Sequence, residues 1–131
     1  TQSMKTARVL IVGGEPETAE LCGVILDKEN DKYVLMAVDW EHSDRVVSIA
    51  EAFKPDIILV LAISCLMPLD GLEVCRRLRA NVEVGHAKII LSSCKHSESV
   101  LDEVKDCGAD VFLQKPFYPK ELCKLIEKLL I

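Results

Sequence analysis

The sequence lacks several features that would assign it to common classes of protein. It has no excess of basic residues, no apolar run as long as a membrane span and no basic-then-apolar leader. Because a span needs roughly 18 consecutive apolar residues, no membrane segment is predicted. The net charge of -5 argues against nucleic acid or an anionic membrane as a direct partner. With 50% of its 131 residues apolar, the chain is expected to form one globular domain.

The six cysteines also lack the C-x-x-C spacing of many metal and redox sites. They occur within apolar periodic segments and not in loops, at positions 22, 65, 75, 94, 107 and 123. Cysteines in such segments usually behave as small hydrophobic residues. We therefore expect buried, reduced thiols and neither a metal site nor a disulfide framework. Reduced thiols in turn favour a cytoplasmic location.

Short apolar runs alternate with amphipathic segments along the chain. The apolar runs predict strands at 8–12, 33–38, 57–63, 87–93 and 109–114. The amphipathic segments predict helices at 16–30, 41–53, 70–80, 97–108 and 120–131. The run at 57–63 contains no polar residue, which is typical of a central parallel strand covered on both faces. Arg76, Arg77 and Arg79 are expected on the solvated face of their helix, although two of them can pair with acidic partners.

Five strands that alternate with five helices through short connections predict an α/β fold. Right-handed crossovers place the strands in one doubly wound parallel sheet with helices on both faces. Residues 8–131 are expected to form this domain, and residues 1–7 to be an N-terminal tail or a cloning remnant. Ligands of such folds bind outside the carboxyl ends of the strands. The residues that follow the strands are therefore the candidate site.

Two glycines follow the first strand, in the stretch RVLIVGGEPE. Gly13 and Gly14 do not belong to a G-x-G-x-x-G or G-K-[ST] pattern, so they do not predict a dinucleotide or P-loop phosphate site. The other candidates at this edge are Asp39 after the second strand, the stretch 61–68 after the third, Ser92 and Ser93 in the fourth, and Lys115 after the fifth. These residues include one carboxylate, one cation and hydroxyl groups, and their spacing alone does not define a reaction.

Five stretches of the chain resemble the receiver domain of two-component response regulators. They are RVLIVGGEPE, KPDIILV, MPLDGLEVCRRLR, KIILSS and GADVFLQKPF, in family order and at family-like distances. The resemblance covers residues 8 to 131. It implies a flavodoxin-like (β/α)5 fold and a role in bacterial phosphorelay signalling. We expect no independent enzymatic activity.

The resemblance also implies roles for four residues of this chain. In the family, an acidic pair after the first strand binds Mg2+, and an aspartate ending the third strand accepts a phosphoryl group from a histidine kinase. A hydroxyl and a lysine then contact the phosphoryl oxygens, and these match Ser92 and Lys115. Phe112 matches an aromatic switch position, and Pro116 matches the proline that follows the lysine.

The carboxylates of the family pattern have no counterpart here. Gly13 and Gly14 match the acidic pair. Counting forward from KPD places Leu61 at the phosphoacceptor position, whereas counting back from MP places Ser64 there. We favour Leu61, because insertions usually fall in loops. Since Mg2+ prefers hard oxygen ligands, usually carboxylates, we expect no Mg2+ binding, no other cofactor and no aspartyl phosphorylation.

A pseudo-receiver that works as a protein-interaction module is therefore the leading interpretation. In the family, the face built by helix 4, strand 5 and helix 5 is the common docking and dimerisation surface. Here it would include Lys105, Asp110, Val111, Lys120, Lys124 and Lys128. The expected partner is a kinase, another regulator or a fused output domain, and a homodimer is compatible with this face. No contact with nucleic acid or membrane is expected.

Two alternatives stay open. In one, the chain is a phosphorylated receiver with a non-standard acceptor, either Ser64 or Asp70. In the other, it is a small anion- or nucleotide-binding domain that uses Gly13, Gly14 and Lys115. Lys115 has no carboxylate partner in the aligned pocket, so it turns to solvent, hydrogen-bonds nearby groups or holds an anion. Asp70 is more simply explained as a helix N-cap than as an acceptor.

Overall fold

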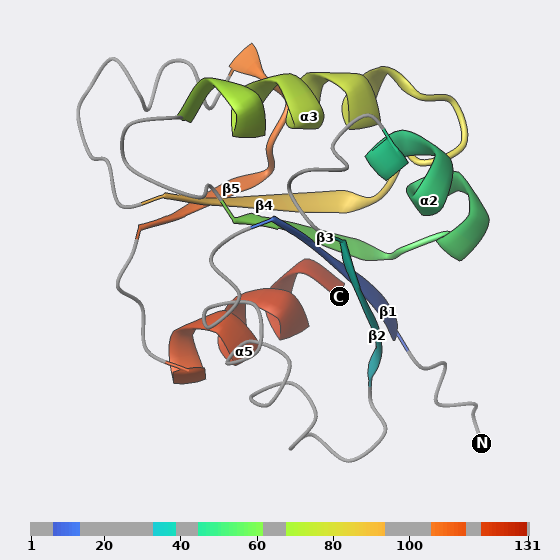
Figure 1. Ribbon diagram of the computed structural model, residues 1–131. Coiled ribbons are helices and arrows are strands. Elements are labelled where there is room, and N and C mark those ends of the chain that lie inside the picture. The colour runs from blue at the N-terminus through green and yellow to red at the C-terminus, as the bar shows by residue number, and fades with distance from the viewer. Residues whose placement is uncertain are drawn as a thin grey trace.

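A parallel sheet with helices on both faces forms the centre of the molecule (Figure 1). The computed structural model describes residues 7–13, 33–38, 45–61, 68–93, 106–114 and 119–130. The strands are β1 (Ala7–Gly13), β2 (Tyr33–Val38), β3 (Ile57–Leu61), β4 (Lys88–Ser93) and β5 (Val111–Gln114). The described helices are α2 (Val46–Phe53), α3 (Pro68–Ala80) and α5 (Pro119–Leu130). The strand order β2-β1-β3-β4-β5 confirms the predicted doubly wound, flavodoxin-like sheet.

The observed elements follow the predicted ones with shifts at their ends. The largest is at α2, which begins at Val46 where a helix from residue 41 was predicted. All five strands are present, and β5 begins two residues later than predicted. α3 begins at Pro68 and α5 at Pro119, because the fixed φ of proline suits a first helical turn. Asp70 therefore lies within the first turn of α3, so its assignment as the N-cap was wrong. The predicted helix at 16–30 lies outside the described residues. So do residues 41–44 of the helix predicted at 41–53 and residues 97–105 of the helix predicted at 97–108.

Two apolar clusters hold the helices against the sheet. Alternate residues of the strands face opposite sides. On one side the strands pack with α2 and α3 through a set that includes Leu10, Ile58, Ala50 and Leu78. On the other side they pack with α5 through residues that include Leu59, Ile90, Leu122 and Ile126. Figure 1 shows α2 and α3 above the sheet and α5 below it.

The central strand is covered on both faces, as its sequence predicts. All five residues of β3 are buried, and they alternate between the two clusters. Each such side chain contributes about 1.5–3 kcal/mol through burial, so the strand is a major source of stability. None of the described helices has both the length and the apolar character that crossing a bilayer requires.

Contacts at the amino end of the sheet fix the register of β1 and β3. The backbone N–H of Arg8 donates to Oδ2 of Asp56 (2.9 Å), and Nε of Arg8 donates to the carbonyl of Phe53 (2.7 Å). The guanidinium also lies over the Phe53 ring, 4.7 Å from its centroid. α2 ends at Phe53 and is capped by Lys54, which has a φ of 54° and donates its N–H to the carbonyl of Ala50. These contacts determine which residues meet at the opposite, carboxyl edge.

Candidate functional site

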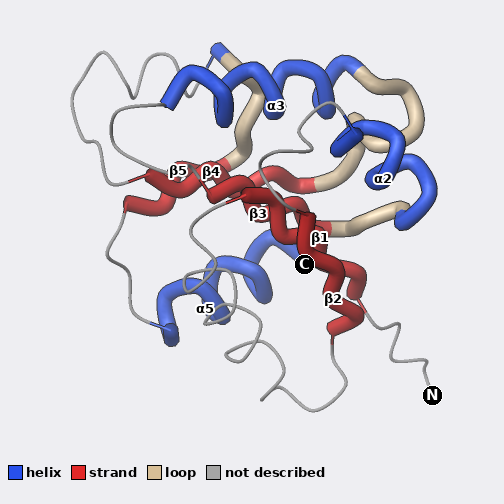
Figure 2. The backbone as a smooth tube through the Cα atoms, viewed as in Figure 1, coloured by secondary structure: helices blue, strands red, loops and turns tan. Residues whose placement is uncertain are grey.

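The strand register brings three of the predicted site residues into one row at the carboxyl edge of the sheet. Gly13 of β1 pairs with Leu61 of β3, Leu61 pairs with Ser92 of β4, and Ser92 pairs with Leu113 of β5. Paired residues of neighbouring strands point to the same side of a sheet. Figure 2 shows how the central strands run side by side to this edge. The row Gly13–Leu61–Ser92 is therefore the structural counterpart of the candidate site.

Gly13 contributes backbone and no side chain to this row. Its φ is 72°, in the left-handed region that glycine adopts at little cost. An L-residue with a side chain would pay roughly 1–2 kcal/mol for this conformation. The strand thus leaves its extended path at the first of the two glycines. Gly14 lies outside the described residues.

Leu61 ends β3 and is completely buried, with 0% of its surface exposed. It belongs to the apolar cluster on the α5 side, together with Leu59, Ile90 and Leu122. Its two pairing partners are Gly13 and Ser92, so it lies at the level of the other matched pocket residues. The competing candidate, Ser64, lies outside the described residues.

Ser92 is the one buried polar residue among those that the structure describes. Its side chain is 0% exposed, and no hydrogen-bond partner for Oγ is found among the described residues. A buried hydroxyl without a partner costs about 1–3 kcal/mol relative to its state in water. The row therefore contains a polar group whose hydrogen-bonding capacity the described fold does not use.

Ser92→Ala is expected to raise the free energy of unfolding by about 1 kcal/mol, because it removes this unpaired hydroxyl. Urea denaturation of both proteins measures the change. Ser48→Ala is the matched control, since Ser48 is exposed on α2 and gains only helix propensity, about 0.5 kcal/mol. A loss of stability in Ser92→Ala would mean that Oγ has a hydrogen-bond partner in solution.

The remaining predicted residues lie on or just after β5. Phe112 is half-buried and packs against the apolar cluster on the α2 and α3 side, opposite to the side of Leu113. Its assignment as a switch position stays a prediction. Lys115 and Pro116 directly follow the end of β5 and lie outside the described residues. The three ways of accommodating Lys115 therefore stay open.

Ionisable side chains are absent from the row itself. Gly13, Leu61 and Ser92 carry no carboxylate, and the described residues contain no group of three or more His, Cys, Asp or Glu side chains that could hold a metal ion. The row can supply backbone groups and one hydroxyl. It supplies neither a carboxylate ligand nor a carboxylate nucleophile.

Sequence reasoning missed an arginine network on the other side of the sheet. Arg76 and Arg77 are exposed and pair with Glu73, as expected of a solvated face. Arg79, however, is only partly exposed and points its guanidinium at several backbone carbonyls. It donates to the carbonyls of Gly85 (2.6 Å), Gly108 (2.8 Å) and Ala87 (3.0 Å) and to Oδ2 of Asp110 (2.6 Å). Its acceptors lie 6 to 31 residues away, so no helical spacing reveals them.

The fold also brings together two cysteines, although their spacing in the sequence does not predict that they meet. Cys75 of α3 and Cys107 are both buried, and each is in hydrogen-bonding reach of the other. Their hydrogen bond lowers the pKa of Cys107 below its ordinary value and raises the pKa of Cys75. Burial also raises the pKa of Cys75. Both thiols are buried, as the sequence predicts for them.

Comparison with known proteins agrees with this architecture and with the motifs. The model of the response regulator receiver domain matches residues 9–127. The chain is 31% identical over 116 residues to the DNA-binding response regulator MtrA of Mycolicibacterium smegmatis, covering 88% of this chain and 46% of that protein. It is 33% identical over 125 residues to the transcriptional regulatory protein AruR of Pseudomonas aeruginosa, covering 94% and 49%. The chain thus spans about half the length of these curated relatives.

Solved structures show the same fold. The signal receiver domain of a histidine kinase from Syntrophus aciditrophicus matches with a TM-score of 0.80 at 26% identity, over 95% of this chain and 89% of that one. The chemotaxis protein CheY4 of Vibrio cholerae matches with a TM-score of 0.80 at 22% identity, over 95% and 98%. The likeness to CheY4 concerns the fold alone. Taken with the family match over residues 9–127, these findings show that the chain belongs to the response regulator receiver domain family of two-component signalling.

Proposed function

We propose that this receiver domain acts in two-component signalling as a protein-interaction module, without Mg2+-dependent aspartyl phosphorylation. The observation that carries the proposal is the row Gly13–Leu61–Ser92, in which three adjacent strands reach the carboxyl edge without a carboxylate. We assign it no catalytic role and no metal or other cofactor. A cytoplasmic location follows from the reduced thiols and the signalling family.

Phosphoryl transfer makes demands that the row does not meet. The transferred group needs a nucleophile in line and positive charge to neutralise its oxygens. Mg2+ is normally held by one or two carboxylates together with phosphate oxygens and water. Leu61 offers no nucleophile, and Gly13 offers only backbone groups. A serine hydroxyl would need a base beside it to become a nucleophile, and no acidic or basic side chain belongs to the row.

The strand pairing supports Leu61, more than Ser64, as the counterpart of the phosphoacceptor. Leu61 lies between Gly13 and Ser92, which match the acidic pair and the strand-4 hydroxyl. The resemblance implies that residues 61–71 are about two residues longer than the family spacing. The extra residues then fall after Leu61, between β3 and α3, where an insertion costs little. The φ of Gly13, 72°, is one that glycine adopts at little cost, so a glycine suits the position that matches the acidic pair.

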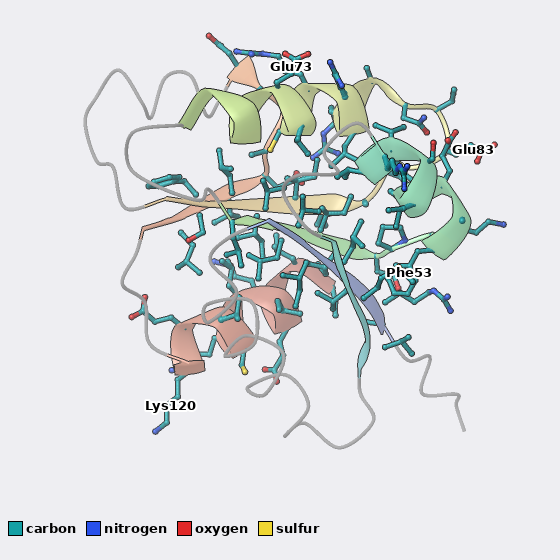
Figure 3. All side chains as sticks on the ribbon, viewed as in Figure 1. Phe53, Glu73, Glu83 and Lys120 are labelled. Atoms are coloured by element: carbon teal, nitrogen blue, oxygen red, sulfur yellow. The ribbon has the colours of Figure 1, made fainter. Side chains whose placement is uncertain are left out.

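For the partner surface, we propose the exposed side of α5 together with β5. Lys120, Lys124 and Lys128 are exposed and recur every four residues, so they form one basic row along the helix. Figure 3 shows Lys120 pointing away from the sheet. Asp110 is less available than its position suggests, because its carboxylate accepts from Arg79 and from the backbone N–H of Ile89. Lys105 lies outside the described residues.

A basic row of this kind suits an acidic surface of another protein. Complementary charge mainly increases the association rate and the selectivity of such contacts. The partner that we propose is a kinase, another regulator or an output module, and a homodimer through the same face is compatible. The named relatives are a DNA-binding and a transcriptional regulator about twice as long as their match here, so any contact with DNA is proposed for another module.

Incubation with acetyl phosphate and Mg2+ is expected to leave the intact mass of the chain unchanged, because the row Gly13–Leu61–Ser92 offers neither a carboxylate ligand for the metal nor a carboxylate acceptor. Mass spectrometry measures the result, and a receiver that has all three carboxylates serves as the positive control. A gain of one phosphoryl unit would overturn the proposal. If this gain in mass were absent from Ser64→Ala or from Asp70→Asn, that residue would be identified as the non-standard acceptor.

A second candidate function is favoured by one observation, the unpaired Oγ of Ser92 in the same row as the Gly13 backbone, with Leu61 between them. An anion held by Gly13, Gly14 and Lys115 would give this hydroxyl a partner. A thermal shift assay with sulfate, phosphate and nucleotides distinguishes the two candidates. Stabilisation that disappears in both Ser92→Ala and Lys115→Met would support the anion site, and no shift would support the interaction module alone.

A further inference from the structure

The fold brings together two thiols that are 32 residues apart in the sequence, Cys75 on α3 and Cys107 just before β5. Neither belongs to the row at the carboxyl edge. Both belong to the apolar cluster on the α2 and α3 side, and each is within hydrogen-bonding reach of the other. The sulfurs therefore share one small buried space.

Neighbouring contacts fix this juxtaposition independently of the sulfurs. Arg79 lies one helical turn after Cys75, on the same face of α3. Gly108 directly follows Cys107, and its carbonyl accepts from Nε of Arg79 at 2.8 Å. Gly108 has a φ of 91°, and a Cβ there would lie only 2.9 Å from Cγ of Arg79. The chain around Cys107 is thus pressed against the last turns of α3.

We propose that Cys75 and Cys107 form a modification site, in which a hydroperoxide such as hydrogen peroxide oxidises the dithiol to a disulfide. Cys107 is the attacking residue and Cys75 the resolving residue. The bond would join α3 to the turn that leads into β5.

The chemistry balances in two steps. The Cys107 thiolate attacks one oxygen of the peroxide, the O–O bond breaks, and Cys107 sulfenic acid and hydroxide form. The Cys75 sulfur then attacks the sulfenic sulfur, the S–O bond breaks, and the disulfide and water form. The Cys75 proton leaves with the departing oxygen, and the hydroxide takes a proton from solvent. Two thiols and one peroxide thus give one disulfide and two waters.

The environment of the pair supports this order of reaction. The Cys75 thiol donates to Cys107 and lowers the pKa of Cys107, and the positive charge of Arg76 acts in the same direction. Only a thiolate is an effective nucleophile towards peroxide, so Cys107 reacts first. The pKa of Cys75 is raised chiefly by its hydrogen bond with Cys107. That cause is removed when Cys107 becomes a neutral sulfenic acid. Burial still raises the pKa of Cys75, so the Cys75 proton leaves only as the S–O bond breaks.

Burial makes the site selective for a small oxidant. Cys75 is 0% and Cys107 2% exposed, so a bulky disulfide reagent cannot reach either sulfur without opening the fold. Hydrogen peroxide is close to water in size. Cys107 lies in the turn that directly follows the helical Asp106 and precedes β5. A small local opening therefore admits the peroxide but not a larger oxidant.

Peptide mapping of the native chain tests the proposal directly. Cleavage after glutamate places each of the six cysteines in its own peptide, with Cys75 in 74–83 and Cys107 in 104–121. After peroxide treatment, removal of peroxide and alkylation in denaturant, the linked pair 74–83/104–121 is expected to exceed every other pair roughly tenfold. Dithiothreitol should release both peptides.

Three variants distinguish the attacking thiol from the resolving thiol. Cys75→Ala is expected to stop at the sulfenic acid, which dimedone traps on peptide 104–121. Cys107→Ala is expected to give neither a link nor a dimedone adduct on peptide 74–83. Cys123→Ala, a half-buried cysteine on α5, is the control and should keep the 75–107 link. Circular dichroism establishes that each variant is folded, and the unmodified chain provides the test if one is not.

The opposite results would overturn the proposal. They are the absence of the 74–83/104–121 link in the native chain, a distribution of links no different from that of urea-unfolded chain, or dimedone labelling of Cys75 before Cys107. None of these outcomes bears on the phosphodonor experiment, because Cys75 and Cys107 lie outside the candidate pocket.

Discussion

Arg79→Ala is expected to lower the free energy of unfolding by about 3 kcal/mol and the melting temperature by about 10 °C. The Arg79 guanidinium donates to three backbone carbonyls and one carboxylate that come from two segments, residues 85–87 and 108–110. Removing it leaves partly buried carbonyls without a partner, which costs more than the net value of the lost hydrogen bonds. Urea or thermal denaturation, followed by circular dichroism, measures the loss.

Two further variants separate this effect from the loss of a surface charge. Arg76→Ala removes an arginine of the same helix whose only described ion pair is an exposed one with Glu73, so a change within about 0.5 kcal/mol is expected. Arg79→Lys keeps the charge but not the planar set of donors, so it should retain most of the loss. If Arg79→Ala and Arg76→Ala were equally stable, the network would contribute nothing beyond a surface pair.

Leu61→Asp is expected to destabilise the fold by about 5 kcal/mol at neutral pH. Such a loss is a large fraction of the stability of a typical domain. Leu61 is completely buried in the apolar cluster on the α5 side, so the variant loses that packing and also buries a charge. The single aspartate is therefore not expected to restore a metal site. Urea denaturation in the presence and absence of Mg2+ measures both effects.

The charge contribution to this loss depends on pH. Burial raises the pKa of the introduced carboxyl above its unfolded value of about 4. Below that value both states are protonated and the charge penalty is absent, and it grows as the pH rises through the folded pKa. Leu61→Asn lacks the charge and should lose about 3 kcal/mol at every pH. If the two variants had the same stability at all pH values, the edge would be open to solvent, and the argument against an acceptor there would weaken.

Most of the fold could be predicted because it depends on local patterns. The uninterrupted apolar run of β3 predicted a strand buried on both faces, and the alternation of strands and helices predicted the parallel sheet. The predicted helix boundaries were less accurate where a proline starts the helix. α3 begins at Pro68, two residues before the predicted start at residue 70. The absence of carboxylates from positions 13, 14 and 61 is likewise a property of the sequence alone.

The sequence by itself therefore determined the family, the order of the elements and the residue types that follow each strand. Only the tertiary structure decided that Gly13, Leu61 and Ser92 form one row, because the pairing of distant strands sets the register. Only the tertiary structure placed Arg79 among distant carbonyls and Cys75 beside Cys107. These contacts join segments that are far apart along the chain. The residue spacing within a single helix or strand does not predict which distant groups will contact that element.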